Sequence, residues 1–398
     1  MKLIFTFLIA LFFTISVEAK TNPATIGNTA NTNQASVTEA PTVQAPKLAA
    51  RSYLLYDYSS KQILLEQAGD ERIEPASLTK LMTAYITFSA LKQNKIKLSE
   101  KVSPSAEAVR TQPSDARMFL QRNKEVTIDE LIHGLIIISA NDAARVLAEK
   151  IATSEVQFAE LMNQEAKRLG MNNTHFVNAS GMPDAMHYST AHDLALLSAA
   201  IFNDFPEHTP LYAQREYEFN HIKHSNRNRL LWLDPYVDGM KTGHTESAGY
   251  SLVSTALRNT HRLISVVIGT TSDHLRTVES QRLLNYGFMN FETFYLYKKD
   301  QPVSNIHLWK GTESTLKVGI RDGLTLTLPK GQRASLKANI ETPQRLLAPI
   351  SDNQQIGILR LTLDDKPYLE IPLVALEPVA EANIFSRGID NIRMIFSK

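Results

Sequence analysis

The stretch Pro75-Ala76-Ser77-Leu78-Thr79-Lys80 places a hydroxyl and an amine three residues apart at the start of a segment with helical periodicity. Pro75 suits the turn before a helix, and apolar residues recur after it at helical spacing. Residues three apart share a helix face, so Ser77 and Lys80 are expected to be neighbours and can form an activated serine nucleophile. A lone Ser-x-x-Lys is, however, more often a capping serine followed by a solvated lysine.

Two further motifs follow in order, Ser139-Ala140-Asn141 and Lys241-Thr242-Gly243. Judged alone, Ser139 and Asn141 are better explained as helix caps. The three motifs together, at domain-scale separations, form the signature of the active-site serine penicilloyl transferases, so the chain resembles penicillin-binding proteins and serine β-lactamases. The flanking sequences PASLTKLMTAY (75–85), SANDAA (139–144), NRNRLLW (226–232) and VDGMKTGHTESAGY (237–250) resemble D-alanyl-D-alanine carboxypeptidases of the penicillin-binding protein 5 and 6 group.

The resemblance implies a metal-free and cofactor-free acyl transfer. Ser77 would attack the carbonyl of the penultimate D-alanine in a peptidoglycan stem peptide, and β-lactams would acylate it by the same route. Lys80 would be its base, so its ordinary pKa of about 10.4 must fall by roughly 3, which burial and the second ammonium of Lys241 both favour. Ser139 and Asn141 would relay a proton to the leaving amine and hold the substrate amide.

Five further residues are assigned to substrate binding by the same resemblance: Thr242, Gly243, His244, Arg227 and Arg276. The Lys-Thr-Gly segment would present a strand edge to the peptide, and the backbone N–H groups of Ser77 and His244 would form an oxyanion hole. Arg276 would bind the terminal carboxylate of the substrate. Its context, Ser-Asp-His-Leu, departs from the glycine-rich version of the family, and an arginine on a surface loop needs no such role.

Composition narrows the class of protein. The 398 residues are 43% apolar and 21% charged, enough for one large domain or two with a buried core. A formal net charge of +1 gives no global reason to expect nucleic acid as a partner. The absence of cysteine excludes disulfides, thiolate metal sites and a cysteine nucleophile.

The N-terminus predicts export. Residues 1–19 have a short positive start, an apolar run too short to span a membrane and a small-residue cleavage site, as in a signal peptide; an uncleaved anchor is the alternative. Residues 20–48 are polar and without apolar period, so they are expected to be a disordered tether.

Residues 49–294 are expected to form an α+β domain of the DD-peptidase and β-lactamase type. The sequence predicts a β-hairpin from 53–56 and 63–65 and a late hairpin from 250–256 and 262–268. A capping box at 127–130 opens a predicted helix that continues through Ile138, and the Ser-Ala-Asn motif is expected on a tight turn between this helix and the next. Helices before an antiparallel sheet are typical of this fold class.

The last hundred or so residues are expected to form a small domain followed by a terminal helix. Residues 295–378 alternate apolar and polar in short runs and are expected to be a small β-rich domain without chemistry of its own. Residues 379–398 form an amphipathic pattern, which predicts a helix lying on a membrane surface or, alternatively, packed on the β-rich domain. With the export signal, this places the protein on the periplasmic face of the inner membrane as a peripheral protein.

Rival functions share the same motifs. A β-lactamase of the class A type would carry a Glu-x-x-Leu-Asn segment, whereas Glu160-Leu161-Met162-Asn163 is one residue shorter and lies in a periodic helix. A DD-endopeptidase is closer, but the His244-Thr245 sequel to Lys-Thr-Gly suits the carboxypeptidases better. A membrane-attached binding protein with a vestigial site is the alternative outside the enzymes.

Overall fold

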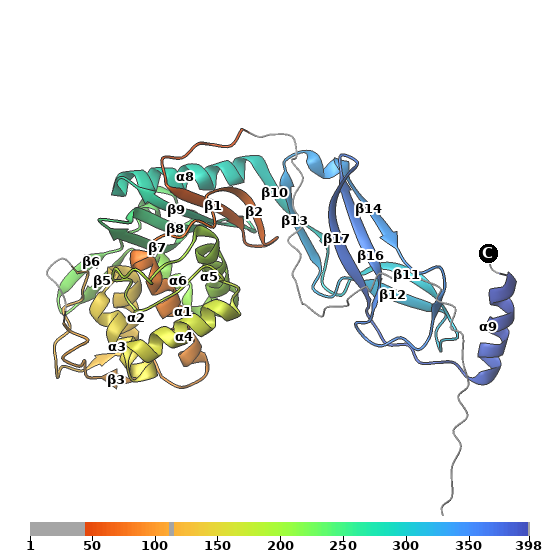
Figure 1. The fold of residues 1–398 in the computed structure, drawn as a ribbon, viewed down its shortest axis with the longest axis horizontal. Coiled ribbons are helices and arrows are strands. Elements are labelled where there is room, and N and C mark those ends of the chain that lie inside the picture. Colours follow the sequence, from red (N-terminus) through yellow and green to blue (C-terminus); the bar gives the residue numbers. More distant parts are fainter. Residues whose placement is uncertain (1–43, 111–114, 397–398) are drawn as a thin grey trace, which may run out of the picture. The chain divides into compact units, whose positions relative to one another are not determined.

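The computed structural model describes residues 44–110 and 115–396. The predicted signal peptide and most of the predicted tether therefore lie outside the described residues. The described chain contains an α+β region followed by a β-rich region and a terminal helix (Figure 1).

A five-stranded antiparallel sheet organises the α+β region, with strand order β2-β1-β9-β8-β7. Both predicted hairpins are confirmed, and β1 pairs with β9 along its whole length, which joins the start of the chain to strands two hundred residues later. The strands are β1 (Ser52–Asp57), β2 (Gln62–Gln67), β7 (Val237–Thr245), β8 (Gly249–Arg258) and β9 (His261–Thr270).

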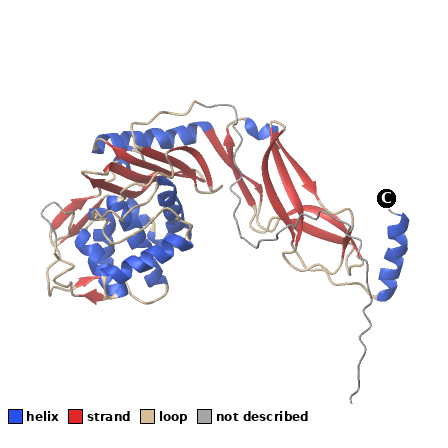
Figure 2. Cartoon of the chain, viewed as in Figure 1, coloured by secondary structure: helices blue, strands red, loops and turns tan. Residues whose placement is uncertain are grey.

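Helices cover both faces of this sheet (Figure 2). The long helix α8 packs on β8 and β9, whereas α5 packs on β1 and β9. The helices of this region are α1 (Lys80–Lys92), α2 (Ile128–His133), α3 (Asn141–Ala152), α4 (Glu155–Arg168), α5 (Ala191–Asp204), α6 (Pro210–Ala213), α7 (Leu230–Leu233) and α8 (Asp273–Asn290). Two small antiparallel two-stranded sheets lie among them, one of β3 (Lys101–Val102) with β4 (Val126–Thr127) and one of β5 (Glu216–Phe219) with β6 (Ile222–Ser225).

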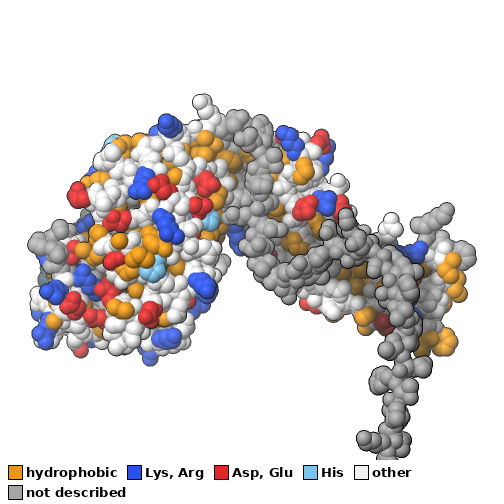
Figure 3. All heavy atoms as spheres, viewed as in Figure 1, with side chains coloured by type: hydrophobic (Ala, Val, Ile, Leu, Met, Phe, Trp, Pro, Cys, Tyr) orange, Lys and Arg blue, Asp and Glu red, His pale blue; other side chains and the backbone are white. Residues whose placement is uncertain are grey.

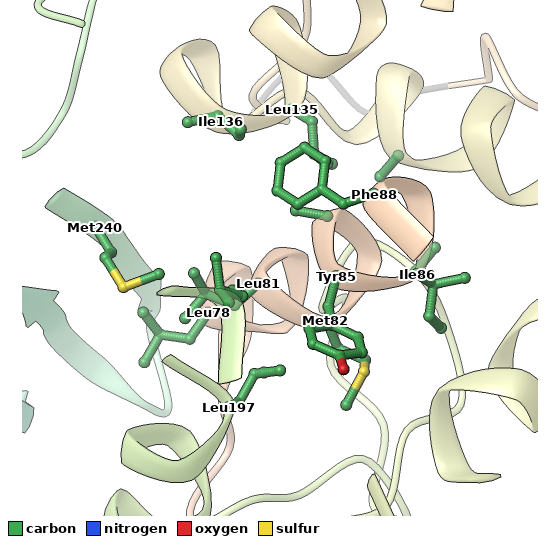
Figure 4. Packing of buried hydrophobic residues seen from close by; sticks show 14 of the residues in the cluster. Leu78, Leu81, Met82, Tyr85, Ile86, Phe88, Leu135, Ile136, Leu197 and Met240 are labelled. Atoms are coloured by element: carbon green, nitrogen blue, oxygen red, sulfur yellow. The ribbon is translucent and has the colours of Figure 1, made fainter. Parts of the chain in front are cut away.

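Helix α1 lies in the middle of the core. Its side chains are buried on nearly every side, in contact with Leu135 and Ile136, with Leu197 of α5 and with Met240 of β7 (Figure 4). A helix surrounded by other elements has no solvent face to define an amphipathic stripe. The helical spacing after Pro75 thus predicted the helix correctly but understated its burial.

The predicted helix starts are confirmed in atomic detail. The Thr127 hydroxyl accepts from the Glu130 amide at 3.2 Å, and the Glu130 carboxylate accepts from the Thr127 amide at 2.8 Å, which completes the capping box of α2. The helix predicted to continue to Ile138 instead changes to a π-helix over Gly134–Ile138. Wider helical turns of this kind are often found beside functional residues.

Beyond α8 the chain is β-rich, as predicted. Strand β10 (Phe291–Tyr297) pairs with β13 (Leu324–Pro329), and a six-stranded sheet has the order β14-β16-β17-β12-β11-β15. Its strands are β11 (Pro302–Trp309), β12 (Thr315–Gly319), β14 (Leu336–Glu341), β15 (Leu346–Leu347), β16 (Gln355–Leu363) and β17 (Lys366–Ala375). These strands enclose their own apolar core, and the chain ends in α9 (Ile384–Phe396). Across residues 44–110 and 115–396, no helix combines the length and apolar character needed to cross a bilayer.

Candidate active site

Ser77 lies on a 3₁₀ helix, Ala76–Thr79, that leads directly into α1. The residue before it, Ala76, has φ +47°, a left-handed conformation that is strained for a residue with a Cβ. Strain of this kind persists where the surrounding structure holds it, and it is concentrated at functional sites. The 3₁₀ turn leaves the predicted pair in contact, with Lys80 Nζ 3.1 Å from Ser77 Oγ.

Lys80 is only 1% exposed, so the solvated lysine of the alternative interpretation is wrong for this chain. Its Nζ donates to Asn141 Oδ1 at 2.7 Å and to the Ser180 carbonyl at 2.6 Å. Burial, together with the positive charge of the nearby Arg227 guanidinium, lowers the pKa of Lys80 from 10.5 to about 7. A neutral amine donates two hydrogen bonds and accepts one, which matches two carbonyl-type oxygens and one hydroxyl.

Ser139 and Asn141 lie where the π-helix ends and α3 begins. Ser139 has φ +64°, so the chain reverses there and both side chains are directed to the interior, where they are buried. Asn141 is the first residue of α3, and its backbone N–H donates to the Ala116 carbonyl at 2.7 Å. The turn predicted between two helices is therefore confirmed, although neither side chain caps a helix.

Lys241 approaches Ser139 from the sheet. It is 3% exposed on β7, and its Nζ donates to Ser139 Oγ at 2.7 Å and to the Thr242 carbonyl at 3.1 Å. Burial lowers the pKa of Lys241 well below its ordinary value, and repulsion from the Lys80 ammonium acts in the same direction. The site thus holds two buried lysines, each hydrogen-bonded to a serine.

Strand β7 and the 3₁₀ helix of Ser77 approach each other closely at Gly243. A Cβ on Gly243 would lie 3.0 Å from the Pro75 carbonyl oxygen and 3.4 Å from the Leu78 amide nitrogen. Any other residue here would require the strand or the segment of the nucleophile to shift by a few tenths of an ångström. Thr242 is buried on the same strand, whereas the exposed His244 packs against Tyr250 with ring centroids 3.9 Å apart and the rings tilted by 31°.

These side chains line one cavity of about 820 Å³, which Ser77, Ser139 and Asn141 share with Thr242, Gly243 and His244. Both predicted arginines line it as well. Arg227 is solvent-exposed within it, whereas Arg276 is only 6% exposed and its Nη1 donates to the Gly243 carbonyl at 3.1 Å. Arg276 is therefore a buried arginine beside the motif strand and not one on a surface loop.

The sequence reasoning missed the loop that supports Lys80. Asn178 Oδ1 accepts from the backbone N–H groups of Ser180, Gly181 and Met182, which fixes the Ser180 carbonyl that Lys80 contacts. Gly181 has φ +82°, and a Cβ there would lie 1.8 Å from the Ala76 carbonyl oxygen. The Asn-Ala-Ser-Gly sequence is a turn signal, but a turn signal gives no indication that the turn faces a lysine a hundred residues earlier.

Three more charged groups at the site were also missed. Asp142 accepts from the backbone N–H groups of Met118 and Leu120 at 3.1 Å each and so anchors the segment beside Asn141. Arg229 and Asp273 line the cavity and form an ion pair at 2.7 Å. Local sequence offered no signal for any of them, because their partners are distant in the chain.

Two family descriptions match the chain. Residues 39–272 match the family described as D-alanyl-D-alanine carboxypeptidase, and residues 291–381 match the C-terminal domain of penicillin-binding protein 5. The chain is 41% identical over 361 residues to D-alanyl-D-alanine carboxypeptidase DacC of Escherichia coli (strain K12), covering 89% of this chain and 90% of the relative. It is 40% identical over 349 residues to DacA of Haemophilus influenzae, covering 87% and 89%.

Solved structures agree with this fold. Penicillin-binding protein 5 from Haemophilus influenzae superposes with a TM-score of 0.83 at 40% identity, covering 85% of this chain and all of that one. Penicillin-binding protein D2 from Listeria monocytogenes, solved in a cefotaxime-bound form, gives a TM-score of 0.57 at 30% identity, covering 62% and 99%. The α+β fold with a C-terminal β-rich region is thus shared, and by its sequence, its fold and its three motifs the chain belongs to the D-alanyl-D-alanine carboxypeptidase family.

Proposed function

We propose that the chain is a serine-type D-Ala-D-Ala carboxypeptidase that removes the terminal D-alanine from peptidoglycan stem peptides through an acyl-enzyme on Ser77. The observation that carries this proposal is the contact between Ser77 Oγ and the Nζ of a buried lysine, at 3.1 Å. A hydroxyl next to an amine whose pKa is about 7 can lose its proton at neutral pH. The enzyme class is also that of the family.

In the acylation step, neutral Lys80 accepts the Ser77 proton while Oγ attacks the carbonyl carbon of the penultimate D-alanine. The tetrahedral oxyanion is stabilised by the backbone N–H groups of Ser77 and His244. Collapse of this intermediate breaks the peptide bond, and the leaving amine takes a proton and departs as D-alanine. Water then hydrolyses the acyl-enzyme, which restores the Ser77 hydroxyl.

The second lysine and serine supply the proton path on the other side of the scissile bond. Lys241 Nζ lies 2.7 Å from Ser139 Oγ, so Ser139 can pass a proton to the leaving nitrogen and be reprotonated by Lys241. Asn141 holds Lys80 through its Oδ1 and offers its amide N–H groups to the substrate.

Substrate binding uses the strand and the arginines. The Thr242-Gly243-His244 segment presents its backbone to the peptide, and Arg227 and Arg276 give the cavity the positive charge that a carboxylate requires. β-Lactams carry a carboxylate next to a strained amide, so they acylate Ser77 by the same route, and a relative in this family has been solved with cefotaxime bound.

The decisive test is the intact mass of the purified mature protein after brief exposure to a penicillin, beside the Ser77→Ala variant. We expect one penicilloyl mass on the wild type and none on Ser77→Ala, followed by release of D-alanine from a D-Ala-D-Ala peptide. Loss of the drug without an adduct would instead indicate a β-lactamase. An intact drug without an adduct would indicate a vestigial binding protein, and cleavage of cross-linked dimers alone would indicate a DD-endopeptidase.

The proposed domain division follows the sequence expectation: export by residues 1–19, a tether over 20–48, catalysis by 49–294, a supporting domain over 295–378 and a membrane-associating helix over 379–398. Its catalytic part contains every proposed site residue.

The C-terminal helix supports attachment to the periplasmic face of the inner membrane. Hydrophobic side chains lie exposed along α9 (Figure 3), where Phe385 is 86% and Ile384 75% exposed. Ile389, Ile392 and Ile395 are exposed as well. Burial of five such side chains in a lipid interface contributes several kcal/mol.

Membrane attachment is tested by co-sedimentation of the mature protein with vesicles that contain anionic phospholipid. We expect the wild type to sediment with the vesicles and an Ile389→Glu/Ile392→Glu variant to remain in the supernatant. Equal binding of both proteins would contradict attachment through α9.

A further inference from the structure

Arg276, which binds substrate in the mechanism above, belongs to a set of three ion-paired residues at the wall of the cavity, and the other two, Asp273 and Arg229, have no part in that mechanism. Arg229 immediately precedes α7, and Asp273 and Arg276 lie one turn apart at the start of α8. All three residues line the cavity that contains Ser77.

The Asp273 carboxylate is shared by the two guanidinium groups. Its Oδ2 lies 2.7 Å from Arg229 Nε, and its Oδ1 accepts from Arg276 Nη2. Arg276 is otherwise held by the Gly243 carbonyl through Nη1, and its buried Nε has no hydrogen-bond partner among the described residues. Nη1 also donates to the Ser251 carbonyl at 3.5 Å, so three acceptors orient the guanidinium while its buried Nε–H group makes no hydrogen bond to them.

The net charge of these three ion-paired residues determines whether a substrate carboxylate is attracted to this wall of the cavity. Asp273 and Arg276 alone would form a neutral pair, so the carboxylate of Asp273 would repel an approaching anion while Arg276 attracts it. With Arg229 on the second oxygen of Asp273, the three residues carry a net charge of +1.

We propose that Arg229 is a positioning residue that neutralises Asp273 and thereby leaves Arg276 available to the terminal carboxylate of the substrate. This inference rests on the proposed carboxypeptidase function. It assigns to Arg229 an action through Asp273, and not a direct contact with the peptide.

The size of the effect follows from exposure. The Arg229 side chain is 66% exposed, so solvent screens its interaction with Asp273. Exposed ion pairs of this kind change an equilibrium by up to about fivefold. We expect Arg229→Gln to raise KM for a D-Ala-D-Ala peptide by roughly two- to fivefold without a change in kcat, since the reacting groups are untouched.

The test is a double-mutant cycle of Arg229→Gln and Asp273→Asn, with KM and kcat measured on a D-Ala-D-Ala peptide. In the Asp273→Asn background, Arg229→Gln should leave KM unchanged, and Arg229→Lys in the wild-type background should keep KM close to that of the wild type. Arg282→Gln is the matched control, because Arg282 forms a 2.8 Å pair with Glu279 on the same helix and does not line the cavity.

Each outcome decides between the two proposals. A KM effect of equal size in both backgrounds would show that Arg229 acts independently of Asp273, and an unchanged KM in Arg229→Gln would show that it does not act at all; either result overturns the inference. A wild-type protein that releases no D-alanine would overturn the proposed function, and the inference with it.

Discussion

The rate at which a penicillin acylates Ser77 should depend on pH through the protonation of Lys80. Burial and the positive charge of Arg227 lower the pKa of Lys80 from 10.5 to about 7, a change worth about 5 kcal/mol. The neutral amine is the base, so the rate is full well above pH 7 and is lost as pH falls through the folded-state pKa. At one pH unit below the midpoint, roughly one-tenth of the plateau rate should remain.

The assay is rapid-quench intact mass of the penicilloyl adduct at saturating penicillin, from about pH 5 to pH 9 at constant ionic strength. The same assay on the Arg227→Gln variant tests whether the midpoint depends on the charge next to Lys80. After burial, the positive charge of Arg227 makes the largest contribution to the lowered pKa of Lys80, so its neutralisation should move the midpoint to higher pH. Arg282→Gln removes the same charge away from the cavity and should leave the midpoint in place.

Two results would refute this reasoning. A midpoint near 10 would mean that Lys80 keeps the pKa of a solvated lysine, and a rate independent of pH between 6 and 8 would mean that Lys80 is not the base. A midpoint that moves to lower pH in Arg227→Gln would contradict only the contribution of the Arg227 charge to the pKa of Lys80, and not the role of Lys80 as the base.

Two further predictions concern the segment that supports the site. Gly181→Ala should slow acylation at least tenfold, because its Cβ would lie 1.8 Å from the Ala76 carbonyl oxygen; Gly170→Ala, with a similar φ of +80° but open space around it, should leave acylation intact, and equal rates in both variants would contradict the steric argument. His187 is buried and its Nδ1 accepts from the Val177 N–H, so burial lowers its pKa from 6.5 to about 4. Its contribution of about 3 kcal/mol is full above pH 6.5 and is lost as pH falls toward 4. The free energy of unfolding, measured with urea for the wild type and His187→Gln, should therefore depend differently on pH only between pH 6.5 and pH 4. Parallel curves through this range would contradict the contribution of His187.

Much of the fold could be predicted from residues that are close together in the sequence. The Thr127 capping box, the β1–β2 hairpin and the late hairpin each depend on neighbours within a few positions, and all are confirmed. The errors arose where distant contacts override local preference. The helix before Ser139 widens into a π-helix, and α1 is buried all round instead of on one face.

The sequence by itself determined which residues carry the chemistry, because the three motifs specify residue types at fixed spacing, and it determined the family to which they point. Only the tertiary structure decided that Lys80 meets Asn141 and Ser180, that Lys241 meets Ser139, and that Arg229 meets Asp273. The physical reason is that a pKa and an ion pair depend on burial and on the distance between charges. Both are properties of segments brought together from across the chain, and no local pattern encodes them.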